Sequence, residues 1–396
     1  FLGQVVGHQA LFIKGDLKPP LRFQHQGAYR LSKVRLIHRN IPFPILIGEG
    51  KVELSNEGLQ WSGAKVEFEN SSLLLHGSWK RTGNVNPLEI MAKGRVDLKN
   101  LFSLSQSPLF SEEVRLKTKE IEDLSGTSLF SFKGWTSKST RHFSYEGELI
   151  PKEAYLRLKG ISSPLTFKDG GFSFSNLSMG FSKMKVQSEI SSLILDGSVK
   201  EGNVNLTSSG SIDLKQLLAF LQSPLAPDRM RSQVDEIQEW SGKAEVRLKW
   251  LGKMDEGITS MREGEIKFKG VSFLHQKIPF PLSQIEGFLI LSPEEIYFKQ
   301  LKGMLADSPL TVSGKLARTS SGRSLSFQIF SPQLDFDSIF PKREKSSPTS
   351  FKKLRDWLSS WKIDGKVEVN RGKYRSLHYQ DLKGEMKTSN GTLFIH

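Results

Sequence analysis

An internal repeat constrains this chain more than any other feature of its sequence. The segment Ile41-Pro-Phe-Pro-Ile returns as Ile161-Ser-Ser-Pro-Leu and again as Ile278-Pro-Phe-Pro-Leu. Ser71-Ser-Leu-Leu-Leu and Gly94-Arg-Val-Asp-Leu also return in the same order, at a spacing of roughly 117 residues. Anchors that recur in one order at nearly one spacing indicate a repeat architecture, in which each unit stacks on the next.

The repeat divides the 396-residue chain into three complete units and the start of a fourth. We place these units at 1–126, 127–242 and 243–364, each with a closing helix, and the truncated fourth unit at 365–396. The chain starts at Phe1 without a signal-peptide pattern, so we expect it to be a segment of a longer protein.

Short runs of alternating apolar and polar residues fill each unit. Examples are Lys51-Val-Glu-Leu-Ser, Gly171-Phe-Ser-Phe-Ser and Lys366-Val-Glu-Val-Asn. A period of two is typical of strands with one buried face. Turn pairs such as Glu57-Gly58 separate the runs, as antiparallel meanders require. The chain has 26 Phe although only 37% of it is apolar, which also favours sheets with one apolar and one solvated face.

A stretch with helical spacing closes each unit, at 111–124, 228–240 and 350–361. Ser111 and Asp228 suit the first turn of a helix, and the Ser-Gly pairs at 125–126 and 241–242 are expected to lead into the next strand. One helix is too little to cover the apolar face of so many strands. That face must therefore be hidden by a second sheet, by closure into a barrel, or by curling of the sheet.

We predict a mainly β protein in which a long, curled antiparallel sheet forms an open, taco-like groove or solenoid. Each repeat of about 117 residues would add one short helix to it. The pattern alone leaves two interiors open. The curled sheet could hold an apolar ligand, or it could be filled by its own side chains.

Two segments resemble the AsmA-like repeat, as found in AsmA-, TamB- and YhdP-type proteins. They are Gly287-Phe-Leu-Ile-Leu-Ser-Pro-Glu-Glu-Ile-Tyr-Phe and Ile363-Asp-Gly-Lys-Val-Glu-Val-Asn, and the resemblance extends from about Gly27 to the end of the chain. It implies a periplasmic β-groove that carries phospholipid between the inner and outer membranes of a bacterium. It also implies an inner-membrane anchor, an N-terminal helix that this segment lacks.

The resemblance predicts phospholipid acyl chains as partners, with both membranes and envelope proteins contacted through parts outside this segment. The alternative function is an envelope scaffold or assembly factor that supports outer-membrane protein biogenesis without carrying lipid. The net charge of +14 is spread along the strands, which favours a solvated face over a nucleic-acid site. Lipid affinity would come from burial of acyl chains, so no specific head-group site is required.

Several kinds of chemistry are not indicated. The chain has no Cys, its eight His lack metal-ligand spacing, and it has neither a Gly-x-Ser-x-Gly elbow nor a P-loop. We therefore predict no catalytic residue, no metal and no cofactor. Asp335-Phe-Asp337 is interpreted as a helix start rather than a calcium loop. Ile41-Pro-Phe-Pro is interpreted as a structural element that prevents wrong strand pairing, with a lateral gate as the less favoured alternative.

The lipid hypothesis selects the apolar residues of the alternating runs as the lining of the groove. Their neighbours in alternation, such as Lys51 and Glu53, are expected to face solvent. The candidate groove residues are Val52, Leu54, Leu73, Leu75, Phe172, Phe174, Leu193, Leu195, Phe288, Ile290, Leu310 and Val312.

Overall fold

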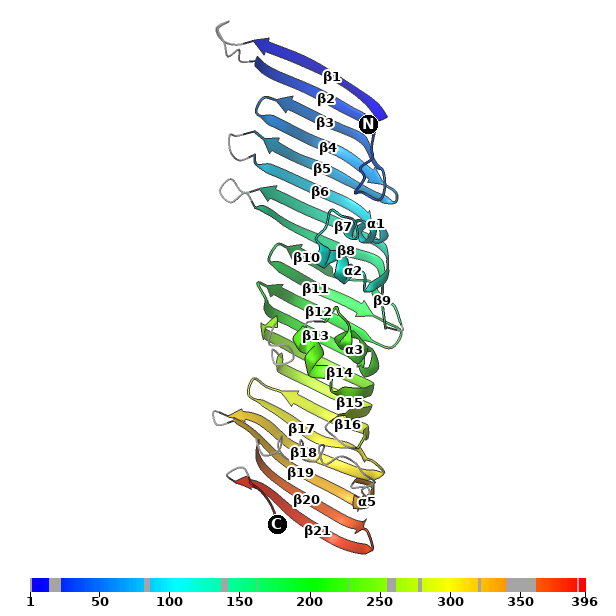
Figure 1. Cartoon of the computed structure of the whole chain (residues 1–396), viewed down its shortest axis with the longest axis vertical. Helices are drawn as coiled ribbons and strands as arrows, with labels where there is room; N and C mark the ends of the chain where they lie inside the picture. The colour runs from blue at the N-terminus through cyan, green and yellow to red at the C-terminus, as the bar shows by residue number, and fades with distance from the viewer. Residues whose placement is uncertain are drawn as a thin grey trace. The chain divides into compact units, whose positions relative to one another are not determined.

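The protein is mainly β (Figure 1), and its strands divide between two compact units. Unit 1 comprises 1–159, 163–188 and 195–201; unit 2 comprises 160–162, 189–194 and 202–396, so the boundary falls within β12 (Ser192–Lys200). The computed structural model describes residues 2–13, 23–81, 86–136, 142–161, 163–226, 228–254, 261–276, 280–319, 322–339, 361–389 and 392–396. The four repeats inferred from the sequence are a different division of the chain, and their boundaries stay a prediction.

Unit 1 is a meander of antiparallel strands. From β1 to β8 each strand pairs with the next one along the chain. β9 and β10 both lie between β8 and β11, so the two together take the place of one interrupted strand. The strands are β1 (Leu2–Ile13), β2 (Phe23–Leu36), β3 (Ile45–Ser55), β4 (Gly58–Phe68), β5 (Ser71–Lys80), β6 (Leu88–Asp97), β7 (Ile121–Thr136), β8 (Phe143–Leu158), β9 (Leu165–Phe167), β10 (Gly171–Ser175) and β11 (Ser178–Gln187).

Unit 2 follows the same plan with one exception. From β13 to β19 and from β20 to β22, neighbouring strands pair in antiparallel fashion, but β19 and β20 run parallel, which makes the sheet mixed. The strands are β13 (Asn203–Asp213), β14 (Ile237–Lys253), β15 (Met261–His275), β16 (Leu282–Leu291), β17 (Glu295–Leu305), β18 (Ser308–Thr319), β19 (Gly322–Asp335), β20 (Trp361–Tyr374), β21 (Leu377–Ser389) and β22 (Thr392–Ile395).

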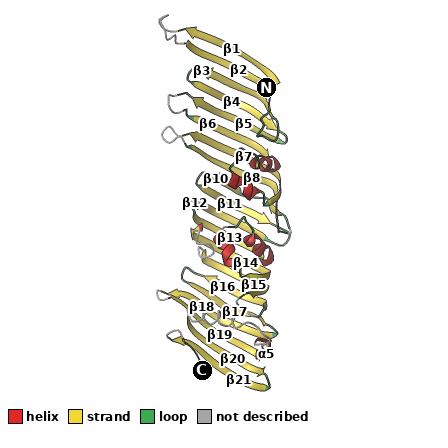
Figure 2. Cartoon of the chain, in the orientation of Figure 1, coloured by secondary structure: helices red, strands yellow, loops and turns green. Residues whose placement is uncertain are grey.

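Four of the described helices form two pairs. α1 (Leu98–Ser105) and α2 (Glu112–Thr118) join β6 to β7, and α3 (Leu214–Gln222) and α4 (Asp228–Val234) join β13 to β14 (Figure 2). α2 and α4 start where a helix was predicted but end earlier, because β7 and β14 take over. α1 and α3 were not predicted. The third predicted helix, 350–361, lies outside the described residues except for Trp361, which begins β20.

Three of the repeated sequence anchors make one recurring contact, here called the Ser–Asp latch. A serine hydroxyl at the start of a strand accepts the backbone N–H of the aspartate that ends a later strand. The three latches are Asp97 to Ser71 at 2.9 Å, Asp213 to Ser191 at 2.9 Å and Asp335 to Ser308 at 3.1 Å. The latch ties each helix start to the sheet.

Each latch aspartate also caps the helix that follows. Asp97 Oδ1 accepts the N–H of Lys99 at 2.9 Å before α1, and Asp213 Oδ1 accepts that of Gln216 at 3.0 Å before α3. Asp335 does the same for Asp337, at 2.9 Å, before α5 (Phe336–Ile339). The interpretation of Asp335-Phe-Asp337 as a helix start is therefore confirmed.

The Ser-Gly pairs do not lie where the helices end. Gly126 and Gly242 lie inside β7 and β14, at irregularities of the pairing with β8 and β15. Their φ angles are +100° and +95°, and a Cβ at Gly126 would meet the Glu153 carbonyl oxygen at 2.1 Å. These positions are glycine bulges within strands, not helix exits, and only glycine fits the close approach.

Candidate functional site

The inward face of unit 1 is apolar and is sealed at one end of its strands. Phe43, Val66 and Phe68 are buried, and Leu104 of α1 packs against them together with neighbouring Ile and Leu side chains. Phe43, from the Ile-Pro-Phe-Pro segment, stacks on Phe68 with ring centroids 4.9 Å apart. We call this end, where α1 and α2 lie, the helix margin (Figure 2). The segment thus acts as an apolar anchor in the bend before β3, and its third copy is described only from Phe280 onward.

The opposite end of the same strands, the hairpin margin, is open. Leu54 and Trp79 are each 37% exposed, Phe143 is 40% exposed and Met179 is 42% exposed. All four belong to the same apolar face by strand register: Leu54 pairs with Leu59, Leu59 pairs with Trp79, and Met179 pairs with Phe174. The apolar face of unit 1 is therefore closed along one margin and accessible along the other.

Six rings form a continuous series on this face, here called the aromatic ladder. Its members, in spatial order, are Phe130, Phe132, Tyr145, Phe174, Phe172 and Phe181, with neighbouring ring centroids 5.6 to 6.3 Å apart. Glycine makes room for them, since a Cβ at Gly147 would lie 2.4 Å from the Phe174 ring. The ladder residues are only half-buried, so their faces stay available for contact.

The apolar face of unit 2 contains a denser core. Ala244, Val246 and Leu248 of β14 are buried together with Val271 of β15 and Leu214 of α3. A second cluster joins α3 to α4 through Leu218, Leu221 and Val234. Here the helix pair and the sheet form an ordinary interior.

The outward face of both units is charged. Exposed ion pairs follow the strands, among them Lys51–Glu53 at 2.6 Å and Lys65–Glu67 at 2.7 Å. Lys51 and Glu53 thus face solvent as predicted. In unit 2 the ammonium of Lys269 bonds to the Glu245 carboxylate and holds the pKa of that carboxyl below its ordinary value. Exposed pairs of this kind contribute solubility more than stability.

Ten of the twelve candidate groove residues lie on the inward side of their strands. They lie on the apolar faces, where Leu73 and Leu75 pack on the Phe43 cluster, Leu193 on the core at Leu214, and Leu310 on the pair Leu334–Val369. Val52, Phe172, Phe174, Leu195 and Val312 are half-buried and Leu54 is at the hairpin margin. Whether these residues touch lipid remains a prediction.

Phe288 and Ile290 were placed on the wrong face. They are 36% and 44% exposed on the outward side of β16, where the Lys267 ammonium lies 5.5 Å from the Phe288 ring centroid. Ile285 and Leu291 point to the apolar core instead. A strand has a period of two, so a one-residue error in aligning the repeats exchanges the two faces.

The pairing register shows the correct alignment. In unit 1, Phe174 of β10 pairs with Gly147 of β8. In unit 2, Leu291 of β16 pairs with Gly264 of β15 in the same way. Leu289 and Leu291, rather than Phe288 and Ile290, are therefore the counterparts of Phe172 and Phe174. Phe130, Phe132 and Tyr145 were not predicted to lie on the apolar face, although the alternation Phe130-Ser-Phe132 has the same pattern as Phe172-Ser-Phe174.

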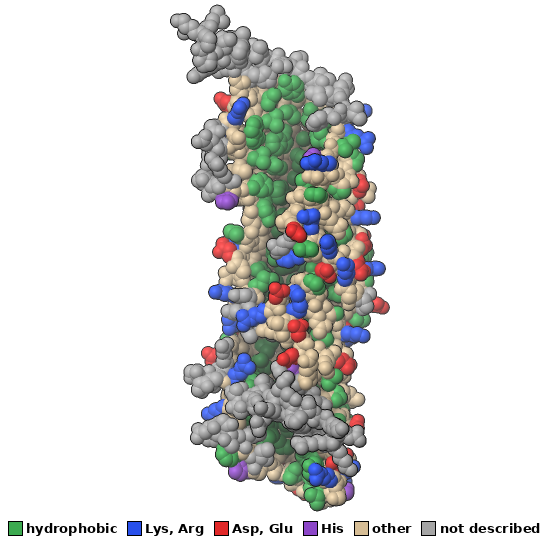
Figure 3. All heavy atoms as spheres, in the orientation of Figure 1, with side chains coloured by type: hydrophobic (Ala, Val, Ile, Leu, Met, Phe, Trp, Pro, Cys, Tyr) green, Lys and Arg blue, Asp and Glu red, His purple; other side chains and the backbone are tan. Residues whose placement is uncertain are grey.

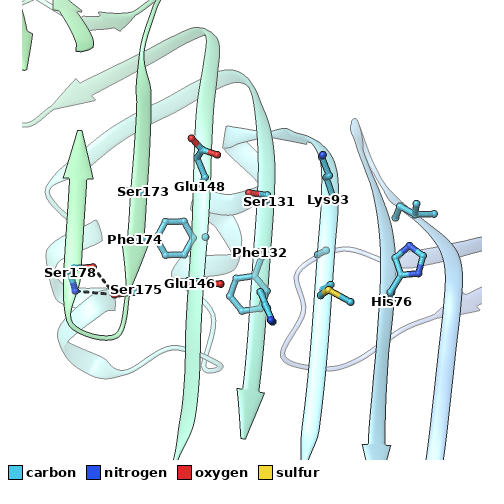
Figure 4. Close-up of a pocket in the computed structure, with 15 residues that line it drawn as sticks. His76, Lys93, Ser131, Phe132, Glu146, Glu148, Ser173, Phe174, Ser175 and Ser178 are labelled. Carbon is cyan, nitrogen blue, oxygen red and sulfur yellow. Dashed lines mark hydrogen bonds between the residues drawn. The ribbon is translucent and has the colours of Figure 1, made fainter. Parts of the chain in front are cut away.

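A shallow cavity of about 730 Å³ lies on unit 1 across the strands from β5 to β11 (Figure 4). Phe132 and Phe174 contribute to its lining beside charged and serine residues, and the hydroxyls of Ser175 and Ser178 are 2.7 Å apart. His76 Nδ1 accepts the N–H of Gly63 at 3.3 Å. No group of His, Asp or Glu in the described part of the chain is arranged to hold a metal ion.

Comparison of the chain with protein-family models, with curated proteins and with solved structures finds no match. Among the described helices, none combines the length and hydrophobicity needed to span a bilayer. Functional inference therefore depends on the two apolar faces and their margins.

Proposed function

We propose that this chain binds phospholipid by its acyl chains in an apolar groove and takes part in non-enzymatic lipid transport between the inner and outer membranes of a bacterium. The protein would lie in the periplasm, anchored by a segment outside this chain. This proposal keeps the expectation drawn from the AsmA-like resemblance and adds where the lipid would lie in unit 1.

The accessible apolar face of unit 1 is the observation that carries the proposal. The strands of the unit join into one layer through hydrogen-bonded neighbours, and α1 packs at β6 and β7. Among the described residues, the aromatic ladder and the row Leu54–Leu59–Trp79 thus have no second layer over them that would bury them fully. Large apolar side chains left half-exposed in a row are typical of a surface that binds an apolar partner.

The shape and chemistry of this face suit a hydrocarbon chain. Hydrophobic side chains of unit 1 gather in a hollowed strip over β3 to β6 (Figure 3). Transfer of a lipid tail from water to such a surface stabilises the complex by about 0.8 kcal/mol per buried methylene. A tail needs no hydrogen-bond partner, which fits a ladder in which five of the six rings are phenylalanine.

The test is lipid capture with matched variants on the two faces of β7 and its neighbours. Phe174→Asp changes the ladder, and Leu129→Asp changes a residue that is 47% exposed on the other face of the sheet. The purified chain is incubated with phospholipid vesicles, recovered, and examined for bound lipid by native mass spectrometry. We expect lipid on the wild type and on Leu129→Asp, and about tenfold less on Phe174→Asp.

Two results would count against the proposal. A wild-type chain that captures no lipid would favour the scaffold function instead. Equal capture by both variants would mean that lipid, although bound, does not lie on the ladder. Circular dichroism of each variant shows whether the strands persist, so that loss of binding is not confused with loss of fold.

A further inference from the structure

The loop between β2 and β3, at the helix margin of unit 1, leaves one large apolar side chain in water. Ile37 is 73% exposed, more than any other large hydrophobic residue in the described part of the chain. Its neighbours in the same loop are placed differently, since Phe43 is buried and Ile41 packs against it. The loop is thus anchored to the inward cluster at one end and exposes Ile37 at the other.

Local hydrogen bonds fix the turn that follows Ile37. The Ile41 N–H donates to the His38 carbonyl oxygen at 3.0 Å, and the Asn40 N–H donates to His38 Nδ1 at 3.2 Å. Ile37 is not among the side chains that pack on the Phe43 cluster. It therefore projects from a defined turn that the core does not cover.

The strand that leads into this loop carries positive charge only. Residues 23–48 contain no Asp or Glu. They contain four exposed cationic side chains: Arg30, Lys33, Arg35 and Arg39. On β3 and β4, in contrast, cations alternate with carboxylates and form ion pairs such as Lys51–Glu53 and Lys65–Glu67. The charge at β2 is thus an excess and does not belong to the alternating pattern of the sheet.

The four cations are available to an outside partner. Within the described residues, their side chains form no ion pair or hydrogen bond. The strand register places Arg35 on the outward face, opposite Leu46, which is 37% exposed there. We call residues 30–39 together with Leu46 the basic corner. It combines uncompensated positive charge with the exposed aliphatic side chains of Ile37 and Leu46.

This combination fits the surface of an anionic bilayer. Basic segments are attracted to anionic phospholipid head groups, and an aliphatic side chain among the cations is stabilised when it enters the interface. A nucleic acid would offer phosphates to the same cations, but its backbone has no apolar layer that could receive Ile37. The exposed isoleucine therefore favours a lipid surface.

We propose that the basic corner docks unit 1 on the surface of a bilayer that contains anionic phospholipid. Lys33, Arg35 and Arg39 contact lipid phosphates, and Ile37 enters the region between head groups and acyl chains. This inference goes beyond the proposed function, because it concerns contact with a membrane surface and not a lipid held on the aromatic ladder.

The first experiment measures cosedimentation of the purified chain with vesicles of phosphatidylcholine, with or without phosphatidylglycerol. We expect association only with phosphatidylglycerol present, and weaker association as the salt concentration rises. R35Q/R39Q should weaken it about thirtyfold, since each cation near an anionic surface contributes about fivefold. The control K65Q/K133Q removes the same charge from ion-paired positions of the outward face, and we expect a change of about twofold or less.

A second pair of variants tests the apolar contact. Ile37→Ser should weaken the association about fivefold, whereas Leu177→Ser should not change it. Leu177 is 62% exposed in the β10–β11 turn, where its neighbours in sequence are uncharged. The chain has no cysteine, so Ile37→Cys and Leu177→Cys can each carry one environment-sensitive fluorophore. Anionic vesicles should blue-shift the emission of the first label and leave that of the second unchanged.

Equal association with and without phosphatidylglycerol, or an R35Q/R39Q variant that associates as well as the wild type, would refute the membrane contact. If R35Q/R39Q abolishes association while Ile37→Ser does not weaken it and the first label does not shift, the basic corner is a general site for polyanions. The residues changed in these docking tests are exposed, so circular dichroism should show unchanged strand content.

Docking and lipid capture fail separately. Phe174→Asp should lose captured lipid and still associate with anionic vesicles, because it leaves the basic corner intact. A wild-type chain that captures no lipid but associates with these vesicles through Ile37 and Arg35 would refute the proposed function and leave the docking surface standing.

Discussion

The strand pair β7–β8 of unit 1 and the pair β14–β15 of unit 2 are built alike but are buried to different extents. Phe132 lies opposite Gly147, as Leu248 lies opposite Gly264, and each strand carries a glycine bulge, Gly126 or Gly242, at the same distance before these residues. The larger side chains are nevertheless the more accessible ones. Phe130 and Phe132 are half-buried, whereas their counterparts Val246 and Leu248 are 8% and 7% exposed.

The helix pairs explain this inversion. α3 contributes Leu214, Leu218 and Leu221 to the buried clusters of unit 2. The buried residues of α1 are Leu98 and Asn100, and Asn100 uses its amide to bond Ser71 at 3.1 Å. α1 and α3 both pack on the strand that follows them, but α3 buries three leucines and α1 buries one leucine and one asparagine. Similar strands thus form a buried core in one unit and an accessible apolar surface in the other.

The largest difference in stability between the two units is expected when a carboxylate is placed at equivalent positions of β14 and β7. Val246→Asp buries a charge without a partner, and we expect the free energy of unfolding to fall by about 4 kcal/mol. Phe130→Asp should cost less than half as much, because the carboxylate reaches water, and should instead lower lipid capture. Urea denaturation followed by circular dichroism measures both losses, and equal losses would contradict the distinction between core and surface.

Smaller effects are expected when the aromatic ring of one unit and the aliphatic side chain at the equivalent position of the other are exchanged. Leu248→Phe overpacks a buried site and should lower the free energy of unfolding by about 2 kcal/mol. Phe132→Leu should cost about 1 kcal/mol and weaken lipid capture, since the ladder loses a central ring. Thermal denaturation ranks the two variants. A larger loss for Phe132→Leu would show that the ladder is part of the core.

The aspartate side-chain caps of α1 and α3 should contribute equally to stability, in contrast to the apolar faces of the two units. Asp97→Ala and Asp213→Ala each remove the side-chain oxygen that caps a helix. The two capping hydrogen bonds have nearly the same length, so each substitution should lower the free energy of unfolding by about 1 kcal/mol. Asn at either position retains a capping oxygen and serves as the matched control. Unequal losses, measured by denaturant titration, would mean that the caps depend on how the face is packed.

The smallest effect is expected on the outward face, where Glu245 takes the place that Leu129 takes in unit 1. The lowered pKa of Glu245 means that its ionised form is favoured in the folded protein. Its contribution is therefore present above the ordinary glutamate pKa of 4.5 and is lost as the pH falls through the lower folded value. Melting temperatures of wild type and Glu245→Gln should differ slightly near pH 7 and converge in acid.

Strand alternation allowed most of the strands to be predicted. A pattern such as Lys366-Val-Glu-Val-Asn indicates a strand with one buried and one solvated face. Helix starts were also predictable from caps such as Ser111. α1 was not, because eight residues carry too little periodicity to be separated from a strand end. Phe288 shows the other weakness: local alternation assigns two faces, but only the pairing register shows which face is inward.

Pairing between strands that follow one another along the chain has a consequence for how the protein forms. Nearly every hairpin in either unit closes a short loop, so its contacts can appear soon after its residues leave the ribosome, and folding can proceed from one end to the other. The exceptions are the pairs joined through helices, and in unit 2 the widest separation lies between β13 and β14, where Asn203 pairs with Lys253. Contacts that span so long a stretch of chain close a larger loop, so we expect the β13–β14 pair to form late and to limit the rate at which unit 2 matures.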